Sequence, residues 1–153
     1  VVLVAMITVA VGGVLARRSA EDLVRAERQA TGAARTDAPT GLPNRLAFTE
    51  ALLRPARAGE RAVVFLDVRG FKRINDSIGH AAGDRVLVRI ARRLQALEGP
   101  GRLVARLGGD EFALVATGPG AGPGAPALAA EVLSAFDKPV EVMGHRLRVR
   151  ASI

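Results

Sequence analysis

The stretch that decides the fold is LVARLGGDEFALVAT, residues 103–117. Two short apolar runs flank the sequence Gly108-Gly109-Asp110-Glu111, and successive glycines permit the positive φ angles of a tight turn. Residues 103–117 are therefore predicted to form a β-hairpin. Its tip carries two adjacent carboxylates, Asp110 and Glu111.

A second acidic position lies upstream, at the end of another apolar run. Residues 62–68 read AVVFLDV and are typical of a buried central strand, which Asp67 nearly closes. A carboxylate in that setting is costly unless it is paired, hydrated or bound to a cation. If the hairpin lies beside this strand, Asp67 and Asp110 converge. Paired carboxylates of this kind suit Mg²⁺, which proteins hold through one or two carboxylates together with substrate phosphates.

The rest of the chain indicates helices packed on that sheet. Pro43 suits the first turn of a helix reaching residue 53, and residues 83–97 place their large apolar side chains on one helical face. A Gly/Pro/Ala loop at 118–126 precedes a helix at 127–136 and strands near 140–143 and 147–153. The order βααββ, then α and β, predicts an α/β (α+β) fold with a mixed, mainly antiparallel sheet flanked by helices.

Four motifs in order resemble the GGDEF family of diguanylate cyclases. Besides GGDEF at residues 108–112, DAPTGLPNR at 37–45 resembles the family's D-x-L-T-G-L-P-N-R, with Pro39 in place of Leu. FLDVRGFKRIND at 65–76 resembles its D-x-D-x-F-K-x-I-N-D segment, and GHAAGD at 79–84 its G-H-x-x-G-D segment. The resemblance covers residues 37–153. It implies a fold similar to the nucleotidyl cyclases and the polymerase palm.

The resemblance implies an enzyme that joins two GTP molecules into cyclic di-GMP and releases two pyrophosphates. Asp67 and Asp110 would hold Mg²⁺ (or Mn²⁺) with the help of the Val68 carbonyl, and Glu111 would lie near a second ion. Asp110 or Glu111 would be the base for the attacking 3′-hydroxyl. Each domain would hold one GTP, so two domains must meet as a homodimer.

The same resemblance assigns the substrate contacts. Asn75 and Asp84 would read the guanine edge, since a carboxylate accepts hydrogen bonds from both guanine N–H groups. The Phe71 backbone and Lys72 would face the phosphates. Asp84 would in addition cap a helix that begins near Gly83. The full substrate-binding set is Phe71, Lys72, Asn75, His80, Asp84, Gly108 and Gly109, in which His80 also fits a structural hydrogen-bonding role.

Three departures from the family pattern bear on activity. Arg69 stands where family members commonly have a second Asp, and a cation there could weaken ion binding or pair with an acid. The product-inhibition motif R-x-x-D would fall at residues 99–102, which read GPGR, so feedback through that site is not expected. The sequence stops inside the family's S-x-G strand, so a last helix with phosphate-contacting Lys and Arg is expected to lie outside it.

The N-terminal segment differs in character from the rest. Residues 1–16 carry no charge and are followed by Arg17 and Arg18, which predicts part of a transmembrane helix with its cytoplasmic side at the arginines. A signal peptide or a buried helix are the other interpretations. Residues 17–36 are expected to form a helical signalling linker, and residues 37–153 the domain. Together these assignments place the protein at the inner (cytoplasmic) membrane with the domain in the cytoplasm.

Composition narrows the function further. The 153 residues contain no Cys, which excludes disulfides, zinc knuckles and thiol nucleophiles. The net charge of +7 comes from basic residues, nearly all Arg, that are spread along the chain and accompanied by only five Phe, so we expect no nucleic-acid partner. Two alternatives stay open. One is a degenerate GGDEF module that binds GTP or dimerises to regulate a downstream EAL phosphodiesterase domain, and the other is a polymerase-like or class III cyclase.

Overall fold

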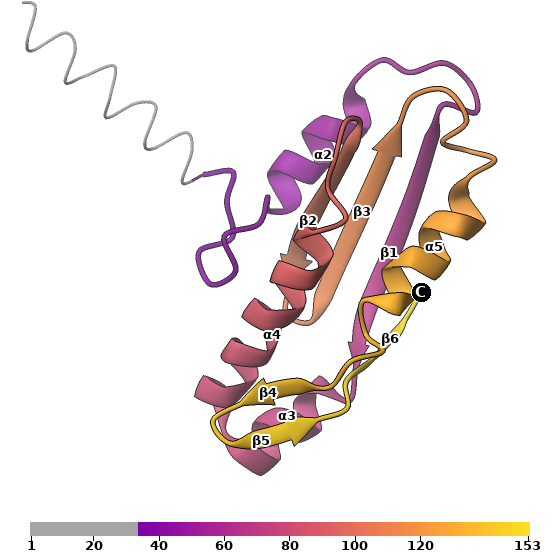
Figure 1. Cartoon of the computed structure of the whole chain (residues 1–153). Coiled ribbons are helices and arrows are strands. Elements are labelled where there is room, and N and C mark those ends of the chain that lie inside the picture. The colour runs from indigo at the N-terminus through magenta and orange to yellow at the C-terminus, as the bar shows by residue number, and fades with distance from the viewer. Residues whose placement is uncertain (1–33) are drawn as a thin grey trace, which may run out of the picture. The chain divides into compact units, whose positions relative to one another are not determined.

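The computed structural model describes residues 34–153 (Figure 1). The predicted membrane segment and all but residues 34–36 of the predicted linker lie outside this part of the chain. Within it, no helix is long and apolar enough to cross a bilayer. The elements are α2 (Arg45–Leu53), β1 (Arg61–Arg69), α3 (Phe71–Ile78), α4 (His80–Gln95), β2 (Arg102–Gly108), β3 (Glu111–Thr117), α5 (Ala125–Ser134), β4 (Val140–Val142), β5 (His145–Leu147) and β6 (Arg150–Ser152).

A four-stranded sheet forms the centre of the domain. Its order is β2-β3-β1-β6 and every neighbouring pair is antiparallel, while β4 and β5 form a separate two-stranded sheet. The predicted hairpin is confirmed as β2–β3, and β3 lies beside β1 as the convergence of the acids required. The single strand predicted over 147–153 is wrong. Strand β5 ends at Leu147, and a separate strand, β6, begins at Arg150 and pairs with β1.

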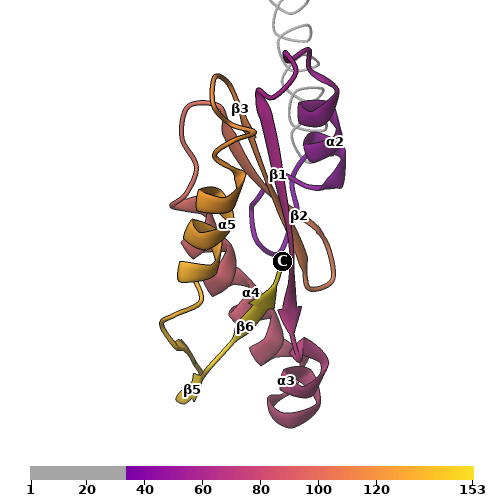
Figure 2. The same ribbon diagram turned by 90° about the vertical axis from the view of Figure 1, so that its right-hand side faces the viewer.

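The two faces of the sheet are covered differently. Helices α4 and α5 lie on one face and α2 on the other (Figure 2). Side chains alternate along an extended strand, so Leu66 and Val68 of β1 enter the core beneath α4 and α5. Phe65 and Asp67 project to the other face, where Phe65 packs edge-on against Phe48 of α2 at a ring-centroid distance of 5.8 Å. Asp67 thus lies on the face that α2 only partly covers.

Local sequence explains where two helices begin. Helix α2 begins at Arg45, because the Asn44 side chain accepts hydrogen bonds from the backbone N–H groups of Leu46 and Ala47. Helix α4 begins at His80, three residues before the predicted start, and its N-cap is Gly79. Asp84 therefore lies inside α4 and is not a helix cap, which corrects the expectation from sequence.

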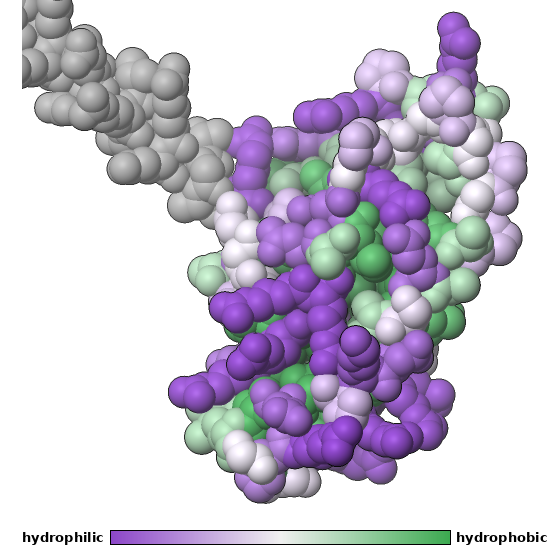
Figure 3. Space-filling view, viewed as in Figure 1, coloured by the Kyte–Doolittle hydropathy of each residue, from purple (hydrophilic) through white to green (hydrophobic). Residues whose placement is uncertain are grey.

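The predicted apolar face of α4 is confirmed. Its large side chains that are buried against the sheet are Val86, Leu87, Ile90 and Leu94. Hydrophilic side chains dominate the surface on the α4 side, with apolar patches between them (Figure 3). The observed architecture is thus the mixed α+β fold with an antiparallel sheet and flanking helices that the sequence predicts.

Candidate active site at the β1 end and the hairpin tip

The hairpin tip is fastened to the end of β1. Asp67 and Glu111 are direct partners in the antiparallel register, and the Val68 N–H donates to the Asp110 carbonyl at 3.1 Å. Gly108 and Gly109 have φ angles of 144° and 53°, values that side chains disfavour. The two glycines are needed for this turn conformation, and the turn carries the acidic pair to the end of β1.

A buried arginine supports the turn from beneath. Arg106 donates from Nε and Nη2 to the Gly109 carbonyl at 3.1 and 2.7 Å, and from Nη1 to Asp37 Oδ2 at 2.9 Å. Its side chain is 9% exposed and that of Asp37 18%. Burial alone would raise the pKa of Asp37, but hydrogen bonds from Thr40 and from Arg106 outweigh burial and lower that pKa below its ordinary value. Asp37, in the motif at residues 37–45, thus supports the acidic turn through Arg106.

The acids at the tip influence one another. Partial desolvation raises the pKa of Asp67, the negative charges of Asp110 and Glu111 raise it further, and Arg69 partly offsets them. Three carboxylates so placed repel one another, and a divalent cation would relieve that repulsion. Asp67, Asp110 and Glu111 therefore fit a Mg²⁺ site by charge and donor type.

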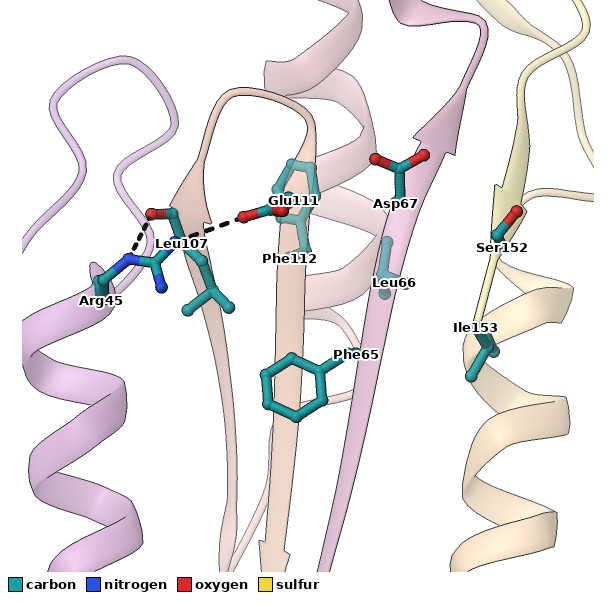
Figure 4. A pocket seen from close by; sticks show the side chains of 9 residues that line it. All are labelled: Arg45, Phe65, Leu66, Asp67, Leu107, Glu111, Phe112, Ser152 and Ile153. Carbon is teal, nitrogen blue, oxygen red and sulfur yellow. Dashed lines mark hydrogen bonds and ion pairs between the residues drawn. The ribbon is translucent and has the colours of Figure 1, made fainter.

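Glu111 is held by an arginine that the sequence analysis gave no role. Arg45 donates from Nη2 to Glu111 Oε2 at 3.3 Å and from Nε to the Leu107 carbonyl at 3.1 Å. The Glu111 carboxylate consequently points towards Arg45 and away from Asp67 (Figure 4). Among residues 34–153, no three His, Asp or Glu side chains are gathered closely enough to hold a metal ion. A metal ion at this tip would therefore be held by fewer than three of the described carboxylates in the observed side-chain conformations.

A cavity of ≈430 Å³ opens beside these acids on the α2 face of the sheet. Its acidic end is formed by Asp67 and Glu111, and its walls are largely apolar. The lining residues are Arg45, Phe65, Leu66, Asp67, Leu107, Glu111, Phe112, Ser152 and Ile153 (Figure 4). A space of this size is in the range of small-molecule sites, which span about 300–1,000 Å³.

The residues expected to read guanine gather where α3 packs on α4. Asn75 Oδ1 is buried and has no hydrogen-bond partner among the described residues. It lies against Gly83, where an added Cβ would fall 1.8 Å from Oδ1 and 3.2 Å from the Phe71 ring. Asp84 is the next residue and is exposed. Gly83, missed as a functional position by sequence reasoning, makes room for the Asn75 amide.

The other predicted contacts flank this region. Lys72 lies exposed in the first turn of α3, and His80 is exposed as the first residue of α4. Phe71 is half-buried and packs against the core beneath α4. Neither the Lys72 side chain nor the His80 side chain makes a hydrogen bond or ion pair within residues 34–153. The structural hydrogen-bonding role considered for His80 has no counterpart here.

The chain is similar in sequence to curated proteins that are named as diguanylate cyclases. The chain is 36% identical over 141 residues to the bifunctional diguanylate cyclase/cyclic di-GMP phosphodiesterase MucR of Pseudomonas aeruginosa, covering 88% of this chain and 20% of MucR. It is 43% identical over 111 residues to the diguanylate cyclase TpbB of the same species, covering 69% of this chain and 26% of TpbB. The chain thus spans about a quarter or less of the length of these relatives.

Solved structures agree with the fold. The GGDEF domain of TpbB (YfiN) from Pseudomonas aeruginosa superimposes with a TM-score of 0.68 at 38% identity, covering 76% of this chain and 72% of that one. The coiled coil and GGDEF domain of DgcB from Caulobacter crescentus, solved in complex with c-di-GMP, gives a TM-score of 0.77 at 26% identity and covers 90% and 76%. The family model described as "Diguanylate cyclase, GGDEF domain" matches residues 34–153. The chain therefore belongs to the GGDEF domain family, whose members include named diguanylate cyclases and composite cyclase–phosphodiesterases.

Proposed function

We propose that this domain condenses two GTP molecules into cyclic di-GMP and two pyrophosphates. The observation that carries the proposal is the β1–β3 register, which sets Asp67 opposite Glu111 while Asp110 is fastened to Val68 at the same tip. Acids gathered at one strand end beside a cavity, with the pKa of Asp67 raised by burial and by its acidic neighbours, are the arrangement expected of a phosphoryl-transfer site. The activity of the longer protein is part of this proposal.

The proposed reaction consists of two in-line displacements at phosphorus, one for each pyrophosphate released. The 3′-hydroxyl oxygen of one GTP forms a bond to the α-phosphorus of the other, and the bond from that phosphorus to the bridging oxygen breaks to release pyrophosphate. Asp110 or Glu111 accepts the hydroxyl proton. Mg²⁺ or Mn²⁺, held by Asp67, Asp110 and the Val68 carbonyl with Glu111 nearby, would supply charge neutralisation. The exposed ion pair with Arg45 competes with either role of Glu111.

Substrate recognition is proposed at the junction of α3 and α4. The Asp84 carboxylate accepts hydrogen bonds from the two guanine N–H groups that adenine lacks, and Asn75 contacts the same edge. Phe71, through its backbone, and Lys72 face the phosphates at the start of α3. The unpartnered Asn75 Oδ1 supports this assignment, because buried polar atoms without partners are unusual outside functional sites.

Product analysis tests the reaction. Purified full-length protein incubated with GTP and Mg²⁺ is expected to yield cyclic di-GMP and pyrophosphate, detected by chromatography and mass spectrometry. The variant Asp84→Ala is expected to weaken binding of GTP far more than binding of ATP. Equal losses for both nucleotides would remove the guanine assignment.

The second candidate is a degenerate module that binds GTP or dimerises and regulates an EAL domain. Arg45 on Glu111 and Arg69 beside Asp67 favour it, because both arginines oppose cation binding at the acids. GTP binding without any cyclic dinucleotide, under Mg²⁺ or Mn²⁺, would select this candidate.

Two further proposals concern assembly. We expect two domains to meet face to face during turnover, so the specific activity of the full-length protein should rise with its concentration. We also propose attachment to the inner membrane through residues 1–16, with the domain in the cytoplasm. After cell fractionation, full-length protein should be in the membrane fraction and protein lacking residues 1–16 should be in the soluble fraction. Finding both proteins in the soluble fraction would contradict the membrane proposal.

A further inference from the structure

Two arginines face each other across the edge of the sheet. Arg69, near the end of β1, is the direct antiparallel partner of Arg150 at the start of β6, and both are exposed. Directly opposed residues of an antiparallel pair project to the same face with Cβ atoms about 4.5–5.5 Å apart. The strand register therefore starts two arginine side chains from neighbouring positions on the α2 face of the sheet.

Neither arginine is compensated by a bonded partner. In residues 34–153, no carboxylate lies within ion-pair distance of Arg69 or Arg150, and neither side chain makes a hydrogen bond. Like charges directly opposite in a sheet are destabilising. The arrangement is thus a repulsive contact that an anion between the two guanidinium groups would relieve, since each can bind a phosphate through two parallel N–H donors.

The pair lies one step along the strands from the acids. Asp67 and Ser152 are the partners two residues away on the same face, a spacing of ~7 Å. Gly70 follows Arg69 directly, with a φ of 74°, and is the N-cap of α3 without any side-chain cap. A Cβ at Gly70 would lie 3.1 Å from Arg73 Nη2, so the Arg73 guanidinium stands over the same turn. An acidic row and a basic row therefore adjoin at this end of the sheet.

We propose that Arg69 and Arg150 together bind the terminal phosphates of a polyphosphate ligand whose remaining phosphate lies at the adjacent acidic row. This inference rests on the proposed function and deepens it, because the ligand is a nucleoside triphosphate or the pyrophosphate released from one. With Arg at position 69 in place of the acid common in the family, the pair would neutralise ligand phosphate charge that a cation bound to that acid would otherwise neutralise. Arg69 and Arg150 would position the ligand without contacting the reacting α-phosphorus, which would lie at the acidic row.

The experiment measures binding of two probes to the full chain by titration calorimetry with Mg²⁺ present. The probes are inorganic pyrophosphate and GTP, and GMP serves as the ligand without terminal phosphates. The variants are Arg69→Ser, Arg150→Ser and their double variant. Arg146→Ser is the matched control, because Arg146 is an equally charged, exposed arginine in β5 of the separate sheet. Circular dichroism and unfolding curves establish that each variant is folded.

Each single variant is expected to weaken pyrophosphate binding roughly tenfold, as loss of a charged hydrogen-bonding partner commonly does. GMP affinity should stay unchanged, and Arg146→Ser should match wild type. Arg69→Lys should recover only part of the lost affinity, because Lys lacks the planar fork. The proposal is overturned if the double variant binds pyrophosphate as tightly as wild type, or if Arg146→Ser weakens binding equally.

The outcome separates this inference from the proposed function. If pyrophosphate binds through the two arginines but GTP yields no cyclic dinucleotide, the basic row stands and the cyclase assignment fails. If cyclic di-GMP forms and the double variant leaves the KM for GTP unchanged, the cyclase assignment stands and the basic row fails.

Discussion

The two flanks of the acidic tip are built on opposite principles. On the hairpin flank, Arg106 spends its donors on the Gly109 carbonyl and on Asp37, so the charges are buried and satisfied within the protein. On the flank of β1, α3 and β6, the side chains of Arg69 and Arg150 and the buried Asn75 Oδ1 atom make no hydrogen bond or ion pair within residues 34–153, although the charge of Arg69 acts on Asp67. The polar groups of the first flank are satisfied by folding, whereas those of the second are the groups that we propose to bind a ligand.

Removal of the Arg106 guanidinium should have the largest effect on stability. Arg106→Leu leaves Asp37 as a largely buried, unpaired carboxylate and frees the Gly109 carbonyl, so we expect a loss of roughly 3 kcal/mol in the free energy of unfolding. Urea unfolding followed by circular dichroism measures it. The matched control is Arg45→Leu, whose exposed pair with Glu111 should contribute less than about 1 kcal/mol. Equal losses would erase the contrast between buried and exposed pairing.

Acid should weaken the hairpin flank selectively. The pKa of Asp37 is lowered in the folded protein, so its contribution to stability is present above its unfolded pKa and is lost as pH falls through the folded value. Wild type should therefore lose stability relative to Asp37→Asn as pH drops below about 4. Thermal melts over an acidic pH series test this. A constant difference between the two proteins at every pH would contradict the assignment.

Asn75 should separate function from stability. Because Oδ1 is already unsatisfied, Asn75→Ala removes no hydrogen bond to the described protein and should change the free energy of unfolding by less than about 1 kcal/mol. GTP affinity should nevertheless fall roughly tenfold, since a contact to guanine is lost. Unfolding curves and calorimetric titration with GTP measure the two effects. A large stability loss with intact GTP binding would assign Asn75 a structural role instead.

The smallest expected effect has the opposite sign. Arg150→Ser removes one of two opposed like charges and should raise the free energy of unfolding by a few tenths of a kcal/mol, roughly the value of a cross-strand charge pair. The gain should shrink as ionic strength rises, because salt screens exposed charges. Unfolding at low and high NaCl concentration checks it. A loss of stability at low salt would show that Arg150 has a favourable partner.

The sequence predicted those parts of the site that local patterns encode. Apolar runs located β1 and the β2–β3 hairpin, the glycine pair located the turn, and helical spacing located the buried face of α4. The start of α4 was misplaced because residues 80–82 carry only a weak apolar signal. The strand at 147–153 was misread because its break leaves no mark in the apolar pattern.

The contacts that support the site could not be predicted from local sequence patterns, because they join residues far apart in the chain. Arg106 meets Asp37 across 69 positions, and Arg45 meets Glu111 across 66. The residues next to each arginine in the sequence do not indicate which carboxylate it will contact. The room that Gly83 makes for Asn75 likewise depends on how two helices pack. Pairing across the fold decides such roles.

The link between Asp37 and Arg106 gives the domain a mechanical property. Asp37 stands at the entrance to the domain, yet it is separated from the acidic turn by a single side chain. We therefore expect a displacement at Asp37 to reach the turn through the Arg106 side chain. A change in the position of Asp37 is thus expected to change the position of the acidic turn at Gly109.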